Sequence, residues 1–168
     1  ALPLDLAGGR AVLRLLRRNS HTQLPDLVAM TGELGNFGAD PEANPAWTWL
    51  EHGGDPSVVC VSPGNHDSYL KPSFGYNSER WGEYMRGETV DAAQFPFVRR
   101  VGETAIISCS SSVPSAPGFA IWRFEQDQAD RLGRILKLMG DAGYFRVALL
   151  PHPPTLDARI FRFRPRGP

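Results

Sequence analysis

The chain has 168 residues, which is the length of one domain, long enough to bury a hydrophobic core and short for two domains. Its 18 basic and 18 acidic residues cancel, so no net charge would draw the protein to nucleic acid or to a membrane surface. No apolar stretch reaches membrane-spanning length, and the start lacks a signal-peptide pattern. Cys60 and Cys109 lie in apolar runs, which favours buried thiols in a reducing compartment. We therefore expect a cytoplasmic protein.

The first part of the chain is expected to alternate helices and strands. Apolar residues between the arginines of Ala11 to Arg18 have helical spacing and predict an amphipathic helix. The short apolar runs Asp26–Met30 and Ser57–Ser62 predict two buried strands. Between them a helix is expected from Ala46 to Glu51, ended by the pair Gly53-Gly54.

The middle of the chain predicts a β-hairpin. The apolar runs Phe97–Val101 and Thr104–Ser108 flank Gly102-Glu103, which suits a two-residue turn. The aromatic segment before the hairpin predicts at most a short helix around Ser78–Met85.

The last helix and strand are the clearest pair. Glu125 to Met139 predicts a helix that ends at Gly140. Its expected apolar stripe consists of Ala129, Leu132, Ile135, Leu136 and Met139. Arg146 to Leu150 predicts a third buried strand, which Pro151 ends. Strands separated by helices imply an α/β fold with a largely parallel sheet, to which the hairpin adds antiparallel pairing.

Unusual polar residues follow three of these strands. The segments are Gly32-Glu33-Leu34-Gly35-Asn36, Gly64-Asn65-His66-Asp67 and Pro151-His152-Pro153-Pro154. In open α/β sheets, ligands bind in the crevice beyond the carboxyl ends of the strands. Amide and carboxylate oxygens with imidazole nitrogens suit a divalent metal or a phosphate ester. We therefore expect the three segments to meet in one site.

The three segments resemble the motifs of the calcineurin-like metallophosphoesterase family, particularly its bacterial phosphodiesterase-like members. That family has strands followed by Gly-Asp-x-x-Asn/Asp, by Gly-Asn-His-Asp/Glu and by His-x-Pro, and the resemblance runs from roughly Pro25 to Pro154. It implies a four-layer α/β/β/α sandwich with mixed sheets, here expected to lack terminal strands. On this view residues 1–158 form a single, partial domain, and residues 159–168 form a basic, flexible tail.

The resemblance also implies a site and a reaction. Two divalent ions, commonly manganese, iron or zinc, would be held by Glu33, Asn65 and His152. A metal-bridged hydroxide would then hydrolyse a phosphomonoester or phosphodiester of a small molecule. His66 would stabilise the phosphate charge or protonate the leaving oxygen, and Asp67 would orient His66.

The motifs depart from the family pattern at several positions. Glu33 replaces an aspartate, and Pro151 replaces the first histidine of His-His-Pro-Pro. No histidine lies two residues after Asp5 or Asp26, and none follows His152. Three candidate ligands fall short of a full dinuclear set. Whether the chain is an enzyme therefore stays open, the alternative being a non-catalytic relative or a truncated fragment with a weak metal or phosphate site.

Plainer structural roles are possible for several of these residues. Asn65 to Asp67 would also suit a turn with capping side chains, and Glu33 an exposed turn. His152 would also suit a loop, and the hydroxyl-rich segment Ser108 to Ser112 is expected to be a loop. Of the remaining histidines, His21 and His52 are expected at the surface. The arginines of the tail would suit nucleic acid or acidic lipid, although an unstructured end is the expectation.

Overall fold

The computed structural model describes residues 15, 18–20, 22–32, 50, 52–64, 82–111 and 124–152. They include two small sheets, one long helix, one short 3-10 helix and parts of two further helical segments, so the predicted α/β class is confirmed. Within these ranges, no helix combines the length and the apolar character that crossing a membrane requires. The predicted tail over residues 159–168 lies outside them.

The first sheet pairs β1 (Val28–Gly32) with β2 (Val59–Pro63) in parallel. All five residues of β2 are buried, which confirms the predicted buried strand from Val59 on, whereas Ser57 and Val58 at its predicted start are exposed and precede β2. The prediction that β1 is buried is wrong, because Ala29 and Thr31 are exposed while Val28 and Met30 are half-buried. A short apolar run does not reveal how many faces of the strand are covered, and only one face of β1 packs against the core.

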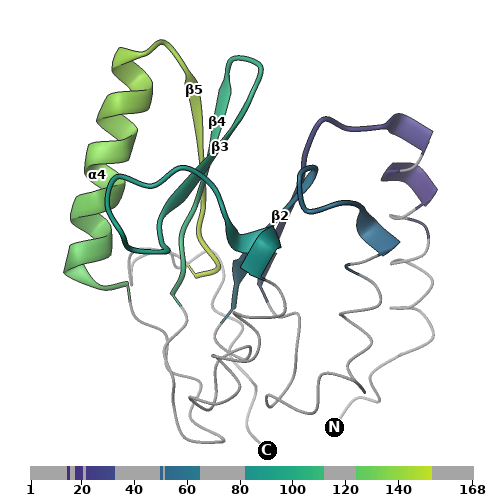
Figure 1. Cartoon of the computed structure of the whole chain (residues 1–168), viewed down its shortest axis with the longest axis horizontal. Coiled ribbons are helices and arrows are strands. Elements are labelled where there is room, and N and C mark those ends of the chain that lie inside the picture. Colours follow the sequence, from purple (N-terminus) through teal and green to yellow (C-terminus); the bar gives the residue numbers. More distant parts are fainter. Residues whose placement is uncertain are drawn as a thin grey trace, which may run out of the picture.

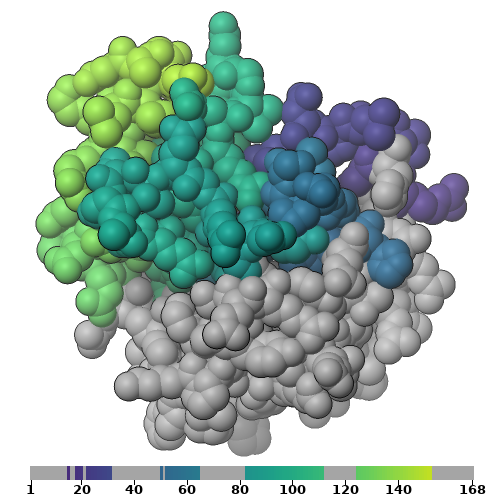
Figure 2. Space-filling view, viewed as in Figure 1, coloured from purple at the N-terminus to yellow at the C-terminus, as the bar shows by residue number. Residues whose placement is uncertain are grey.

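The second sheet contains the predicted hairpin. It is built from β3 (Phe97–Val101) and β4 (Thr104–Ser108), whose bounds agree with the prediction. Gly102 begins the turn with φ +54, a conformation that costs glycine little. Figure 2 shows this end of the hairpin protruding from the described surface.

The strand β5 (Phe145–Leu149) pairs in parallel with β4 and completes the sheet in the order β3-β4-β5. The prediction that this strand is buried is wrong: Phe145 is 70% exposed and Ala148 is exposed. Among the described strands it has one neighbour, so it is an edge strand whose apolar composition resembles that of a central one.

The helix α4 (Gln126–Asp141) covers one face of this sheet (Figure 1). Ile135 is 1% exposed and lies in a cluster with the sheet residues Val98, Ala105 and Ile107. The rest of the predicted stripe that packs there consists of Leu132, Leu136 and Met139. The helical spacing of these residues therefore identified the buried face correctly.

The predicted end of this helix is wrong by a short distance. Gly140 lies inside the last turn, the helix continues to Asp141, and Ala142 is the cap. The left-handed conformation that favours glycine occurs at Gly143, with φ +85. Two glycines three residues apart both suit a helix end, and local sequence does not decide between them.

The other face of the second sheet packs against the first sheet. Phe97 and Ile106 join a core with Val59, Cys60 and Val61 of β2. The short 3-10 helix η3 (Gly82–Met85), in the region where a short helix was expected, adds Tyr84 and Met85 to this core. The described part of the molecule thus has the layer order helix, sheet, sheet.

Two further helical segments lie beyond the first sheet, and each overlaps a predicted helix only in part and extends past its predicted end. Positions 15, 18–20 and 22–23 are helical, as are residues 50 and 52–53. Figure 1 shows the purple helical segment on the side of β2 away from α4. Leu50 is fully buried in the core that contains β2, so the second of these segments packs on the first sheet.

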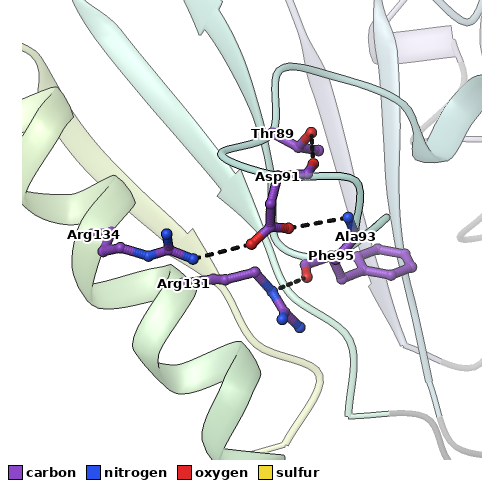
Figure 3. A network of polar contacts seen from close by, with 6 residues as sticks. All are labelled: Thr89, Asp91, Ala93, Phe95, Arg131 and Arg134. Atoms are coloured by element: carbon purple, nitrogen blue, oxygen red, sulfur yellow. Dashed lines mark hydrogen bonds and ion pairs between the residues drawn. The ribbon is translucent and has the colours of Figure 1, made fainter.

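A polar network joins the segment before β3 to α4 (Figure 3). One Asp91 carboxylate oxygen accepts from the Ala93 backbone N–H at 3.0 Å, and the other accepts from Arg134 at 3.0 Å. Arg131 donates to the Phe95 carbonyl oxygen at 3.1 Å. The Ala93 N–H and then the two arginines lower the pKa of Asp91, which stays ionised at neutral pH. The network holds the entry to β3 against the helix.

Candidate functional site

The carboxyl ends of four described strands lie together. Gly32 and Pro63 are paired partners at the ends of β1 and β2. The Ser62 hydroxyl donates to the Cys109 carbonyl oxygen, which links the end of β2 to the residue that follows β4. The Cys109 N–H donates to the Leu149 carbonyl oxygen at 3.0 Å, which links that residue to the end of β5. The parallel pairing of β1 with β2 and of β4 with β5, together with these contacts between strand ends, therefore creates a common rim.

The rim contains buried serines. Ser62, Ser108, Ser110 and Ser111 are all buried. The Ser108 hydroxyl donates to the Val61 carbonyl oxygen at 3.4 Å, so Ser62 and Ser108 hold the two sheets together at this end. Hydroxyls that satisfy backbone carbonyls allow a polar rim to be buried at low cost.

His152 lies at this rim. Its Nδ1 atom is 2.7 Å from the hydroxyl oxygen of Ser111, which is 2% exposed. The imidazole is half-buried, as is Pro151 before it. Ser111 thus engages one ring nitrogen of His152, and the metal-ligand role of His152 stays a prediction.

A glutamine from α4 holds the serine segment in place. The Gln128 side chain accepts from the Ser110 N–H at 2.9 Å and donates to the Ser110 carbonyl oxygen at 2.6 Å. Gln128 is 7% exposed although it lies on a helix of largely exposed polar residues. The position of Ser111 is thus tied to both the helix and the sheets.

The two cysteines are buried thiols, as predicted, and neither forms a disulfide. Burial raises the pKa of Cys109 to about 12. Burial also raises the pKa of Cys60, against a smaller opposing effect of the Arg99 charge. Both thiols are neutral at pH 7, so neither has the thiolate character of a nucleophile or a metal ligand.

Only one of the predicted site residues belongs to the part of the chain that the structure describes. His152 is described, whereas Glu33, Asn65, His66 and Asp67 lie outside it. Glu33 directly follows the last residue of β1, and Asn65 comes two residues after the last residue of β2. In the part of the chain that the structure describes, no three His, Cys, Asp or Glu side chains form a potential metal cluster. His52 is exposed, as expected, and His21 is outside the described residues.

Sequence reasoning missed Gln128 and the serines as parts of this rim. Residues 109–111 do lack regular structure, as expected, yet all three are buried, and the Cys109 and Ser110 backbone groups and the Ser111 hydroxyl are hydrogen-bonded. The available signal was a run of small polar residues directly after an apolar strand, at the carboxyl end where ligands bind. Gln128 lies four and seven residues before Leu132 and Ile135, on the face of α4 that packs against the sheet, so helical spacing was the available signal for its burial.

The opposite end of the sheets contains a different polar feature. Arg99 donates to the carbonyl oxygens of Arg86 at 2.8 Å, Val59 at 2.9 Å and Glu83 at 3.0 Å, and also to that of Pro56. Burial lowers the pKa of Arg99, although a guanidinium stays charged at any physiological pH. Arg99 therefore joins the start of β2, η3 and the hairpin by backbone contacts.

An open hollow of about 620 Å³ lies beside Arg99. Its charged lining consists of Asp55, Glu83, Arg86, Glu88, Arg99 and Arg100. Three arginines balance three carboxylates, and Arg100 pairs with Glu88 at 2.7 Å. This balance gives the hollow no preference for a ligand of either charge.

Comparison with protein-family models and with curated proteins finds no match for this chain. Function therefore has to be inferred from the geometry of the strand ends and from the motifs that follow them.

Proposed function

We propose that the chain is a metal-dependent phosphoesterase domain of the calcineurin-like type, which hydrolyses phosphomonoesters or phosphodiesters of small molecules. The observation that carries this proposal is the common rim at the carboxyl ends of β1, β2, β4 and β5. The first motif segment begins at Gly32, the second begins directly after its paired residue Pro63, and the third contains His152. Glu33, Asn65 and His152 thus belong to segments that leave the sheets at one place.

The layer order is consistent with the proposed four-layer α/β/β/α sandwich. α4, the β3-β4-β5 sheet and the β1-β2 sheet supply three layers in the required order. In the proposed sandwich, the helical residues beyond the first sheet would belong to the fourth layer (Figure 1).

In the proposed site, Glu33, Asn65 and His152 hold the metal ions. Divalent ions such as Mn²⁺, Fe²⁺ or Zn²⁺ would lower the pKa of water and neutralise the phosphate charge when bound. His66 approaches the phosphate and stabilises its charge or protonates the leaving oxygen. Asp67 fixes the orientation of His66. The partly buried contact between His152 and Ser111 supports this assignment, because it resembles the outer contact of a metal-bound histidine.

Hydrolysis of bis(4-nitrophenyl) phosphate with added Mn²⁺ tests the proposal. We expect turnover that EDTA abolishes and that falls by roughly 10²–10⁴-fold in His66→Ala, because a general acid or charge stabiliser contributes that much. His52→Ala, at an exposed histidine, is the matched control and should retain the activity of the unaltered chain.

Metal analysis of the same preparations separates the enzyme from its alternative. A phosphoesterase should bind two equivalents of Mn²⁺. A cooperatively folded chain that binds one equivalent or none, and that does not hydrolyse the ester, would be a non-catalytic relative. Lack of a cooperative thermal transition would instead indicate a truncated fragment.

A further inference from the structure

We propose that Ser111 is a positioning residue that fixes the imidazole of His152 with its proton on Nδ1, and that Gln128 holds Ser111 in place for this task. The inference deepens the proposed function and depends on it in one respect, namely that His152 presents Nε2 to a metal ion. It assigns a role to Ser111, in the segment after β4, and to Gln128 of α4, both of which lie outside the three motif segments.

The Ser111 hydroxyl is placed by its neighbours with little freedom. Two residues before Ser111, the Cys109 carbonyl oxygen accepts from the Ser62 hydroxyl, and the Cys109 N–H donates to the Leu149 carbonyl oxygen at 3.0 Å. One residue before Ser111, both backbone groups of Ser110 bond to the Gln128 carboxamide, at 2.9 and 2.6 Å. Four successive backbone polar groups are thus engaged immediately before Ser111.

The contact itself selects one ring nitrogen. Ser111 and His152 are 41 positions apart in the sequence, and their Oγ and Nδ1 atoms are 2.7 Å apart. A neutral imidazole has one N–H and one bare nitrogen, and only the bare nitrogen coordinates a metal. With Nδ1 engaged by Ser111, coordination uses Nε2, so Nδ1 must donate its proton to the serine oxygen.

The opposite proton arrangement defines the competing chemistry. If the Ser111 hydroxyl donates to Nδ1, then Nε2 carries the proton and His152 cannot ligate a metal in that form. The pair would then resemble a serine and its general base, although Ser111 is 2% exposed and is poorly placed to reach a substrate. The tautomer of His152 therefore discriminates between the two arrangements.

Long-range ¹H–¹⁵N correlation spectra of the histidine-labelled full chain without added metal provide the direct test. The His152 signals can be assigned by comparison with His152→Gln. We expect a pyrrole-type Nδ1 and a pyridine-type Nε2 in a single tautomer. A protonated Nε2 with a bare Nδ1 would overturn the inference, whatever the outcome of the ester hydrolysis.

Substitutions then test whether Ser111 and Gln128 keep His152 in a single tautomer. Ser111→Ala should give a mixture of the two tautomers, whereas Ser111→Thr, which keeps the hydroxyl, should retain one. Gln128→Met should broaden the His152 signals, while Gln126→Met, at an exposed position of the same helix, should leave them unchanged. Thermal melting of each variant identifies any that does not fold. Unchanged His152 signals in a folded Ser111→Ala chain would contradict the positioning role.

Zn²⁺ titration separates this inference from the proposed function. If His152 is a ligand, added Zn²⁺ should shift its Nε2 signal, and Ser111→Ala should weaken Zn²⁺ binding by roughly 10-fold, as loss of an outer contact does. A Zn²⁺-dependent shift without ester hydrolysis would refute the phosphoesterase activity and leave the positioning role supported. Ester hydrolysis with no effect of Zn²⁺ on the His152 signals would support the phosphoesterase activity and refute the positioning role.

Discussion

Gly87 lies where the hairpin leaves no room for a side chain. Its neighbour Glu88 exchanges two backbone hydrogen bonds with Val98, at 2.9 and 2.8 Å, which draws the two segments together. A Cβ atom on Gly87 would overlap the Val98 carbonyl oxygen and lie 2.7 Å from the Phe97 ring. Because both neighbours belong to β3 in the core, they can yield only by moving the strand.

Gly87→Ala should therefore lower the free energy of unfolding by about 1–3 kcal/mol, the usual cost of overpacking. Gly133→Ala is the matched control, because Gly133 is an exposed residue of α4 with nothing within 4 Å of an added Cβ. It should raise the stability by about 1 kcal/mol through helix propensity. Urea denaturation of both variants measures the difference, and equal stability of the two would show that the contact at Gly87 is misjudged.

The buried thiol of Cys109 makes the folded protein lose stability as the pH becomes alkaline. Burial raises its pKa from 9.0 to about 12 in the folded protein. The unfolded chain loses the thiol proton first, so the stabilisation is complete below pH 9.0 and is lost as the pH rises toward about 12. Urea titrations between these limits should show a steeper loss of stability for the unaltered chain than for Cys109→Ala. Parallel pH profiles would mean that the thiol is accessible to water.

At the scale of single residues, the sequence predicted which residues lie at the site better than it predicted the partners that those residues contact. His152 was selected because it follows a strand and precedes prolines, and it does lie at the rim. Its partner Ser111 was assigned to a plain loop, because a contact between residues 41 positions apart leaves no local pattern. Burial of both cysteines was predictable from the apolar runs around them.

At the scale of single elements, the buried face of α4 contributes most of the stability that this helix adds to the fold. Ile135 is 1% exposed beneath the helix and contacts the residues of β3 and β4, whereas Leu138 on the same helix is 53% exposed. Ile135→Ala should lower the free energy of unfolding by about 2–5 kcal/mol, because it removes buried methyl groups and leaves a cavity.

Leu138→Ala is the control for helix propensity and should cost less than about 1 kcal/mol. Thermal denaturation followed by circular dichroism compares the two variants under identical conditions. Similar losses at both positions would show that α4 does not pack on the sheet with the face described.

The elements predicted best are those whose pattern is specific to their environment. The helical stripe of α4 and the glycine turn between β3 and β4 each admit few alternatives. The apolar runs of β1 and β5 were mistaken for fully buried strands, because the number of neighbouring strands is set by distant parts of the chain. Gly140 has the composition of a helix end, yet α4 continues to Asp141, and the left-handed glycine after it is Gly143.

At the scale of the whole molecule, the meeting of the strand ends follows from topology, whereas the packing of the two sheets against each other does not. Parallel strands joined by helices bring their carboxyl ends to one edge, so the meeting of strand ends was predictable. The packing of β2 against β4 through Ser62 and Ser108 was not, because those contacts span 47 positions of the sequence. The proposed chemistry depends on both, since they bring the end of β5 and His152 beside the ends of β1 and β2.

Mn²⁺-induced broadening of amide signals tests this convergence most directly. Added Mn²⁺ should broaden Gly32, Gly64 and His152 together, at the ends of three different strands. Gly102 and Glu103, at the opposite end of the hairpin in Figure 1, should stay sharper, and excess Zn²⁺ should restore the broadened signals. Broadening at one strand end alone, or equally at the hairpin turn, would contradict a metal site shared by the three segments.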